Sequence, residues 1–394
     1  MGEEKVYPQN ATNNQGETMK VNIIAPVLGY SGYAIHARNL GLALDKLGVD
    51  VGFETFIPDP NWQDQVTPEL RRLILKDNRD AENQVMITPP PQAYTKSGQR
   101  KNIFQYAIFE GTQIPTSWKH ALSQPWITEI IAPSKHTKQS ITRAGVNKPI
   151  SVIPHGVDTK IFNPTATPLL PKTKDEFRFV WCKGWAIGEK DRSGLEIFLR
   201  AFTTEFTEKD KVKAIVKINP SYANKDYNQA IRDLKLEGPH KKSIMANFEI
   251  LPEKELAGIY TSGDVFVACS KGDAFDLPAL EAMACGLPLI YSTHNGHEDF
   301  AHGWPIKKGK YITPGDPNPI YEEAKWWETD QKELQKTMRE VYTVQNVTRN
   351  EGMVAKQRTE NYTWENSAKN LTQTIEKTLN NTPTPPPRKP NPTQ

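Results

Sequence analysis

One segment, residues 264–290, limits the folds open to this chain more than any other part of it. An apolar run, Val265–Val267, leads into a loop with two acids. The pattern of a short helix follows, which ends near Gly286, and a second apolar run covers Leu287–Tyr291. This order predicts a strand, a loop, a helix and a strand of a parallel sheet, in which ligands bind beyond the carboxyl ends of the strands. The segment therefore favours an α/β fold with a ligand site at this loop.

The loop and the helix start suit an anionic ligand that also carries hydroxyl groups. Free backbone N–H groups and the positive end of the helix dipole favour an anion such as a diphosphate. Glu281 follows Asp273 by eight residues, and its carboxylate can accept hydrogen bonds from sugar or ribose hydroxyls. The structural alternative takes Asp276 as an N-cap, Pro278 as a first-turn residue and Gly286 as a C-terminal cap. That alternative explains the helix but leaves the pair of acids unexplained.

The same residues resemble the donor-binding signature of retaining glycosyltransferases of family 4, which have the GT-B fold, within the glycosyl transferases group 1. The signature is an acid, then Gly-Phe-Gly-Leu-Pro, then a Glu within Glu-Ala-Met-Ala-x-Gly-x-Pro. The matching positions in this chain are Phe275, Leu277, Pro278, Glu281, Ala282, Met283, Ala284, Gly286 and Pro288. Three positions depart, because Asp273 replaces the Glu, Ala274 the first Gly and Asp276 the second Gly. The helical half is thus intact, and the sugar-facing loop is altered.

Length and resemblance together predict α/β architecture with two Rossmann-like parallel-sheet domains that face a central cleft, as in GT-B. A chain of 394 residues is too long for one ordinary core. The predicted parts are a disordered N-terminus (1–18), an acceptor-side domain (19–165), a nucleotide-sugar donor domain (166–360), a C-terminal helix that crosses back to the first domain (361–380) and a disordered Pro-rich tail (381–394).

The first domain offers two candidate site residues at the ends of predicted strands. A Gly-rich turn, 29–32, follows the strand Val21–Ala25. Many such turns merely allow tight packing, but in the resembled family this turn lies at the cleft, so Gly32 is a candidate donor-binding residue. Glu110 follows the predicted strand Ile103–Phe109, where a carboxylate faces the cleft and can meet an acceptor hydroxyl. A loop-bracing or helix-capping role for this Glu is the alternative.

A cationic loop follows the predicted strand Phe177–Trp181. Family 4 enzymes place an Arg and a Lys here to neutralise the donor diphosphate, on which negative charge grows as the glycosidic bond breaks. In this chain Lys183-Gly184 replaces the usual Gly-Arg, and Lys190 and Arg192 lie near the helix start. We expect at least one of these three cations to contact the diphosphate. The alternative is a solvated basic loop.

Three further patterns help to place the elements. The segment Pro154–Asp158 resembles the one that closes the first domain in the family, where His155 and Asp158 are expected to brace the interdomain loop. In the second domain, apolar runs predict strands at Ile215–Ile218 and Phe248–Leu251.

Composition argues against several other classes of protein. The nearly balanced net charge of +3 gives no strong signal for nucleic-acid binding. No apolar run reaches the length of a membrane span and residues 1–18 lack a signal-peptide core, so we expect no transmembrane segment and leave peripheral membrane association open. The three cysteines lack metal-ligand spacing and indicate reduced, mostly buried thiols of a cytoplasmic protein.

The resemblance implies a retaining hexosyltransferase, and the residues themselves indicate that it is metal-independent. No Asp-x-Asp motif stands in a suitable loop to share Mg²⁺ with a diphosphate, while Lys and Arg can supply the same positive charge. The resemblance implies a nucleotide diphosphate sugar as donor, no cofactor, and the hydroxyl of a glycan, lipid-linked or other acceptor. The candidate catalytic residues are Asp273 and Glu110, and the candidate donor-binding residues are Gly32, Lys183, Lys190, Arg192, Phe275, Asp276, Leu277 and Glu281. The alternatives are a non-catalytic sugar-nucleotide-binding GT-B protein and a GT-B nucleotide-sugar epimerase.

Overall fold

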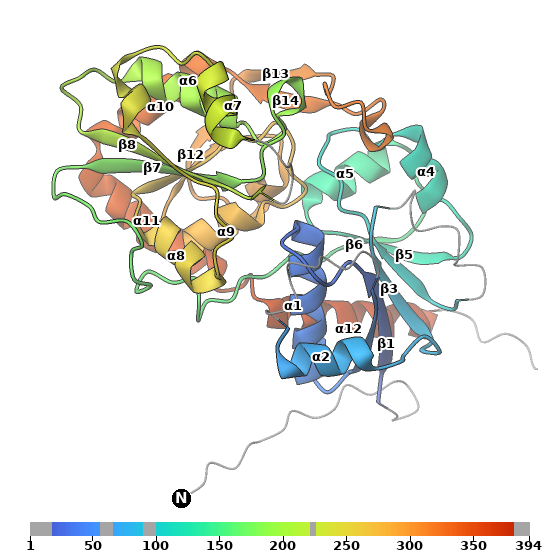
Figure 1. The fold of residues 1–394 in the computed structure, drawn as a ribbon. Coiled ribbons are helices and arrows are strands. Elements are labelled where there is room, and N and C mark those ends of the chain that lie inside the picture. The colour runs from blue at the N-terminus through green and yellow to red at the C-terminus, as the bar shows by residue number, and fades with distance from the viewer. Residues whose placement is uncertain (1–17, 56–65, 90–99, 221–225, 382–394) are drawn as a thin grey trace, which may run out of the picture.

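The computed structural model describes residues 18–55, 66–89, 100–220 and 226–381. The predicted disordered ends, 1–18 and 381–394, lie outside the described residues except for Thr18 and Asn381. Within the described part, the chain forms two parallel sheets of six strands each, and helices cover both of them (Figure 1). The predicted α/β class with two parallel-sheet domains is therefore confirmed.

The first sheet has the strand order β2-β1-β3-β4-β5-β6. Its strands are β1 (Lys20–Ala25), β2 (Asp50–Thr55), β3 (Asn83–Ile87), β4 (Ile103–Tyr106), β5 (Ile127–Ala132) and β6 (Ile150–Val152). The helices of this part are α1 (Gly32–Lys46), α2 (Pro68–Leu75), α4 (Thr116–Leu122) and α5 (Lys135–Arg143). The central strands are buried along almost their whole length because a parallel sheet is covered on both faces.

The second sheet has the order β12-β11-β10-β7-β8-β9. Its strands are β7 (Phe177–Lys183), β8 (Val212–Ile218), β9 (Ile244–Asn247), β10 (Val265–Ala268), β11 (Leu289–Ser292) and β12 (Gly303–Ile306). The helices and short 3-10 turns of this part are η3 (Gly188–Lys190), α6 (Leu195–Glu205), α7 (Tyr227–Asp233), η5 (Pro239–Ser243), α8 (Glu253–Thr261), α9 (Leu277–Ala284), η6 (Gly296–Asp299), α10 (Gln331–Thr343) and α11 (Gln345–Thr359). The predicted strand–loop–helix–strand unit of residues 264–290 is β10, α9 and β11.

One predicted strand is wrong. The apolar run Phe248–Leu251 is not a strand, and the edge strand β9 lies immediately before it and pairs with β8. The residues of β9 are only half-buried because an edge strand has a neighbour on one side alone, so they lack a strong apolar pattern. Phe248 instead stacks its ring on Tyr227 of α7, with the ring centroids 5.5 Å apart.

The last helix of the second half of the chain lies on the first domain. Helix α12 (Trp364–Asn381) packs beside α1 (Figure 1), and it buries Ala368, Leu371 and Ile375 completely. The start of α12 rests on Gly156, where a Cβ atom would lie 2.1 Å from the backbone nitrogen of Trp364. A side chain at position 156 would therefore push the helix away.

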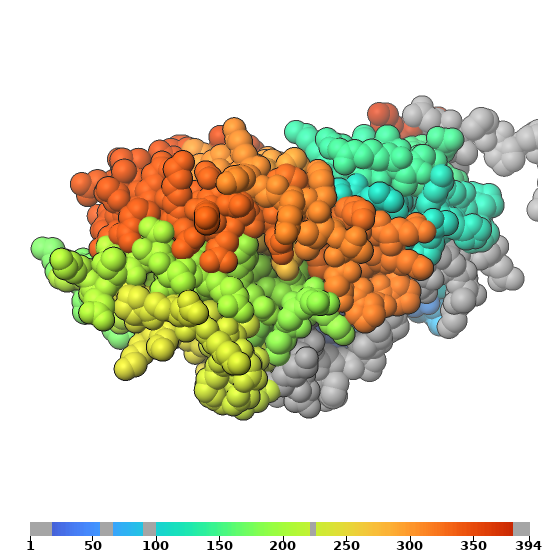
Figure 2. Space-filling model, turned by 90° about the horizontal axis from the view of Figure 1, so that it is seen from above, coloured from blue at the N-terminus to red at the C-terminus, as the bar shows by residue number. Residues whose placement is uncertain are grey.

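A second connection joins the two parts of the molecule on another side. The antiparallel strands β13 (Gly309–Ile312) and β14 (Trp326–Thr329), with the short turn η7 (Pro319–Tyr321) between them, form a segment that we call the bridging segment, residues 309–329. Seen from above, this orange segment lies against the teal part of the first domain (Figure 2). The backbone N–H of Thr112 donates a hydrogen bond of 2.9 Å to the carbonyl of Lys325. The bridging segment thus ties the second sheet to the loop that follows β4.

The cysteines and the helices bear on two further predictions. The three cysteines, Cys182, Cys269 and Cys285, are buried and unpaired, as the sequence predicted. Among the helices of the described ranges, none combines the length and the apolar character needed to cross a membrane.

Candidate active site

Five charged side chains meet where the carboxyl end of the second sheet faces the loop after β4. We call them the charge cluster: Glu110, Lys183, Arg192, Asp273 and Asp276. Glu110 comes from the first domain, and the other four come from the second. Since carboxyl ends of parallel strands are the usual place for ligands in such folds, the cluster is the candidate active site.

Lys183, the last residue of β7, lies at the centre of the charge cluster. Its ammonium donates hydrogen bonds of 2.7 Å to Asp273 and 2.5 Å to Asp276, and a third of 2.7 Å to the hydroxyl of Ser270. Burial alone would lower the pKa of Lys183, but the two carboxylates outweigh it and hold the pKa above its usual value. The lysine is thus charged and already paired on two sides.

Arg192 connects the acids of the two domains. Its guanidinium donates to the carbonyl of Gly272 at 2.5 Å and lies 3.4 Å from Asp273 and 3.8 Å from Glu110. Burial would raise the pKa of Asp273, but Lys183 and Arg192 hold it well below its usual range. The two cations thus favour the ionised form of Asp273.

The pKa of Glu110 is shifted in the opposite direction from that of Asp273. Its side chain is 16% exposed, and burial raises the pKa of its carboxyl above the usual value, which Arg192 opposes and Asp273 reinforces. The hydroxyl of Tyr321 from the bridging segment lies 3.4 Å from one oxygen of this carboxyl. Two carboxyls with pKa values pushed apart thus lie on either side of one arginine, an arrangement that suits proton transfer and charge stabilisation.

Asp276 is the N-cap of α9, as the structural interpretation of the sequence predicted. Its φ of 79° lies in the left-handed region, which Gly, Asn and Asp adopt most readily. One carboxylate oxygen accepts from the backbone N–H of Ala279 at 3.2 Å, and the other faces Lys183 and the ring nitrogen Nδ1 of His297 at 3.1 Å. The Asp276 carboxylate thus brings a negative charge to the start of α9, and Lys183 and His297 hold it in place.

A second aspartate, Asp191, holds backbone N–H groups at the start of α6, although the N-cap residue of that helix is Gly194. Asp191 is buried, and its carboxylate accepts from the backbone N–H groups of Gly194 at 3.2 Å and Glu196 at 3.1 Å. Burial raises the pKa of this carboxyl. The available signal was an Asp just ahead of an apolar helix, a common N-cap pattern. Carboxylates thus accept from the N–H groups at the starts of both α6 and α9, and the start of α9 is where an anion was expected.

Glu281 lies deeper in the second domain, on α9. It is buried, and it accepts a hydrogen bond of 2.7 Å from the hydroxyl of Tyr260 on α8. Burial raises the pKa of Glu281 to about 8, although the bond from Tyr260 lowers it in part. No sequence pattern indicates this tyrosine, because the two residues come from different helices.

The remaining predicted donor-binding residues lie outside the charge cluster. Phe275 and Leu277 are buried in the apolar core, and the Phe275 ring lies 4.8 Å from that of His155. Lys190 is exposed on η3. Gly32 begins α1, and a Cβ atom there would meet no other atom within 4 Å. Close packing therefore does not require glycine at position 32, and the donor-binding roles of all these residues stay predictions.

The charge cluster does not have the form of a metal site, since cations separate its acids. Among residues 18–55, 66–89, 100–220 and 226–381, no group of three or more His, Cys, Asp or Glu side chains is arranged to hold a metal ion. Metal independence itself stays a prediction.

Comparison with known proteins agrees with the resemblance seen in the sequence. Residues 184–330, which contain most of the charge cluster, match the family model of glycosyl transferases group 1. The resemblance to that group is thus confirmed for this segment, and the narrower assignment to family 4 stays a prediction. The chain is 28% identical over 233 residues to a probable sucrose-phosphate synthase of Thermosipho melanesiensis, a match that covers 58% of this chain and 47% of the relative. The chain spans about half the length of the curated relatives it matches.

Solved structures show the same fold over nearly the whole chain. The sucrose-phosphate synthase of Thermosynechococcus elongatus superposes with a TM-score of 0.66 at 16% identity and covers 92% of this chain and 100% of its own. The Anabaena protein HepE, solved in complex with UDP and glucose, gives a TM-score of 0.59 at 13% identity and covers 91% of this chain and 100% of its own. At these identities the likeness establishes the architecture, which is that of GT-B proteins.

Proposed function

We propose that this protein is a glycosyltransferase that moves a hexose from a nucleotide diphosphate sugar to an acceptor hydroxyl with retention of configuration. The observation that carries the proposal is the meeting of Glu110 from the first domain with Arg192 and Asp273 from the second. Such a meeting supports chemistry between two ligand sites, one on each domain. The match of residues 184–330 to glycosyl transferases group 1 supports the same class of reaction.

In the proposed reaction each member of the charge cluster has one role. Glu110 contacts the acceptor hydroxyl from the first domain. Asp273 lies on the sugar side of the donor, and Arg192 between them stabilises the charge that grows on the departing diphosphate. The acceptor attacks from the face that the diphosphate leaves, and the diphosphate helps to take the proton of the acceptor hydroxyl. Glu281 accepts hydrogen bonds from the ribose, and no divalent metal takes part.

The unpaired cysteines support a cytoplasmic setting.

The test is release of nucleoside diphosphate from a panel of nucleotide sugars, measured with and without candidate acceptors. Glu110→Gln and Asp273→Asn should each lower turnover by about a hundredfold or more. Glu208→Gln, an exposed acid outside the cluster, is the matched control and should leave turnover unchanged. Since Asp273→Asn also removes a partner of Lys183, its thermal stability is measured beside the wild type. Full turnover in both cluster variants would refute the proposal.

One observation favours a second candidate, a GT-B protein that binds a sugar nucleotide without transferring its sugar. Asp191 and Asp276 accept from N–H groups at the starts of α6 and α9, and two carboxylates already pair with Lys183. A diphosphate would have to compete with these carboxylates for the same N–H groups and the same ammonium. Tight binding of a nucleotide sugar without turnover against any acceptor would establish this candidate in place of the first.

A further inference from the structure

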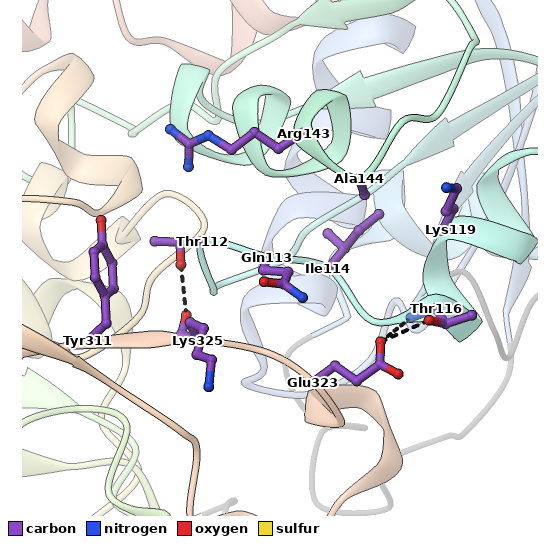
Figure 3. A pocket seen from close by; sticks show the side chains of 10 residues that line it. All are labelled: Thr112, Gln113, Ile114, Thr116, Lys119, Arg143, Ala144, Tyr311, Glu323 and Lys325. Atoms are coloured by element: carbon purple, nitrogen blue, oxygen red, sulfur yellow. Dashed lines mark hydrogen bonds between the residues drawn. The ribbon is translucent and has the colours of Figure 1, made fainter.

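A cavity of about 780 Å³ lies between the first domain and the bridging segment. The loop after β4, the start of α4 and the end of α5 form one side, and Tyr311, Glu323 and Lys325 form the other (Figure 3). Thr112 lines the cavity two residues after Glu110, and Cα atoms at that spacing are at most about 7 Å apart. The cavity therefore neighbours the charge cluster without being part of it.

Three cations line the cavity: Lys119, Arg143 and Lys325. Each of the cations in the charge cluster has a carboxylate within 4 Å, whereas none of these three has one among the described residues. Lys325 donates to the hydroxyl of Thr313 at 2.9 Å, and Arg143 donates to the side-chain oxygen of Gln139 at 3.2 Å. Three unneutralised positive charges around one cavity favour an anion there.

The one acid of the lining, Glu323, offsets one of these charges, so the four charged side chains leave the lining with an excess of positive charge. Glu323 accepts from the hydroxyl of Thr116 at 2.8 Å and from its backbone N–H at 3.2 Å, and so caps the first turn of α4. The backbone of Glu323 has a φ of 63°, an uncommon conformation for this residue type. Such conformations persist where the surroundings enforce them and are frequent in ligand-binding walls.

The rest of the lining suits a sugar ring. Thr112, Gln113 and Thr116 bring hydroxyl and amide groups, which can exchange hydrogen bonds with sugar hydroxyls. Ile114 and the ring of Tyr311, which is 52% exposed, add apolar surface on opposite domains. Apolar walls with a few polar groups are typical of small-molecule sites.

We propose that this cavity binds an anionic saccharide, a sugar that carries an oxyanion such as a phosphate or a carboxylate, and that this saccharide is the acceptor. Lys119, Arg143 and Lys325, whose charged groups lie on different sides of the cavity (Figure 3), attract the oxyanion through the positive charge of the lining, while the polar loop residues bind the ring next to Glu110. The identification of the ligand as acceptor rests on the proposed function, whereas the binding itself does not.

The first experiment measures binding to the full chain by calorimetry, with no donor present. The probes are glucose 6-phosphate, glucuronate, glucose and inorganic phosphate. We expect the phosphate or the carboxylate sugar to bind at least about tenfold more tightly than glucose. Each of Lys119→Gln, Arg143→Gln and Lys325→Gln should weaken that binding by about tenfold. The matched controls Lys209→Gln and Arg71→Gln, exposed cations outside the cavity, should leave it unchanged.

The outcomes separate this proposal from the proposed function. Equal affinities for glucose and both charged sugars, or wild-type affinity in all three single variants, would overturn the cavity as an anion site. Equal affinities for inorganic phosphate and glucose 6-phosphate would overturn the saccharide part. If the charged sugar binds but accepts no hexose from any nucleotide sugar, the proposed acceptor role fails and the binding site stands. If the protein instead transfers sugar to neutral acceptors and binds no anion, the proposed function stands and the cavity fails as an anion site.

Discussion

At position 276, one residue decides both the backbone geometry and the charge of the candidate site. The left-handed backbone explains why the family signature has Gly here and why Asp is accepted in its place. The difference is electrostatic, since the carboxylate pairs with Lys183 and caps α9. The departure from the signature thus leaves the fold intact and changes what an anionic ligand encounters.

We predict that Asp276→Gly strengthens the binding of nucleoside diphosphates by about tenfold, because it frees the N–H groups of α9 and one bond of Lys183. Calorimetry with a panel of nucleoside diphosphates measures the effect. Asp276→Asn is the matched variant, since it keeps a capping oxygen and removes the charge, and it should give a smaller gain. Unchanged affinity in both variants would mean that the phosphates bind elsewhere.

Glu281 provides a prediction about pH. Its pKa of about 8 in the folded protein lies above that of an unfolded Glu, so between these two values the folded state holds a proton that the unfolded state has lost. The contribution of Glu281 to stability therefore falls as the pH rises from the unfolded value toward 8. Glu281→Gln, which still accepts from Tyr260, should raise Tm at pH 8, by about 1–2 °C for each kcal/mol gained, and have a clearly smaller effect near pH 5.

Thermal unfolding at both pH values checks this prediction, with Glu208→Gln as the exposed control. A Tm difference between Glu281→Gln and wild type that is the same at pH 5 and pH 8 would contradict a raised pKa. Donor affinity of the same variant tests the ribose role separately.

The sequence could place the residues of the candidate site only where a general rule of the fold applies. Glu110 and Asp273 each follow a strand of a parallel sheet, so each could be placed at a ligand-binding edge. The two strands belong to different sheets, and only the resemblance to GT-B, with its two sheets facing one cleft, indicated that the edges would meet. The pairing of Lys183 with Asp276 joins residues 93 positions apart. No local pattern announces such a pair, and the lysine expected to bind phosphate proved to be paired within the protein.

At the scale of elements, the docking of α12 provides a test of stability. Gly156→Ala should destabilise the protein by about 1–3 kcal/mol, because the new methyl group would overlap the backbone of Thr363 and Trp364. Urea unfolding measures the loss. Gly32→Ala is the matched control, since its methyl group would enter open space and should cost no stability. A stable Gly156→Ala protein would show that α12 shifts without cost.

Gly32→Ala also tests the predicted donor-binding role of that glycine. Lower donor affinity at unchanged stability would support it, and unchanged affinity would remove Gly32 from the site.

Elements were predictable where apolar character was continuous and both faces of a strand were covered. Strands β1, β7 and β10 meet this condition and lie close to their expected positions. Strand β3 carries two polar residues, Asn83 and Gln84, whose side chains are satisfied by buried hydrogen bonds, so its pattern was not recognised. The edge strand β9 was missed because half-exposed positions need not be apolar.

For the whole molecule, we predict that sugar transfer needs no divalent metal. Lys183 and Arg192 supply positive charge at the place where a metal would otherwise neutralise a diphosphate. Turnover should be unchanged by a chelator such as EDTA and should not rise on addition of Mg²⁺ or Mn²⁺. Activity that EDTA abolishes and Mg²⁺ restores would contradict this prediction.

The contacts between the domains are spread over several places. Thr112 donates to Lys325 of the bridging segment, Ser134 donates to the carbonyl of Ala274 at 2.6 Å, and α12 packs on α1. Any parting of the two sheets would therefore have to break hydrogen bonds that the loop after β4 and the start of α5 make with the second domain.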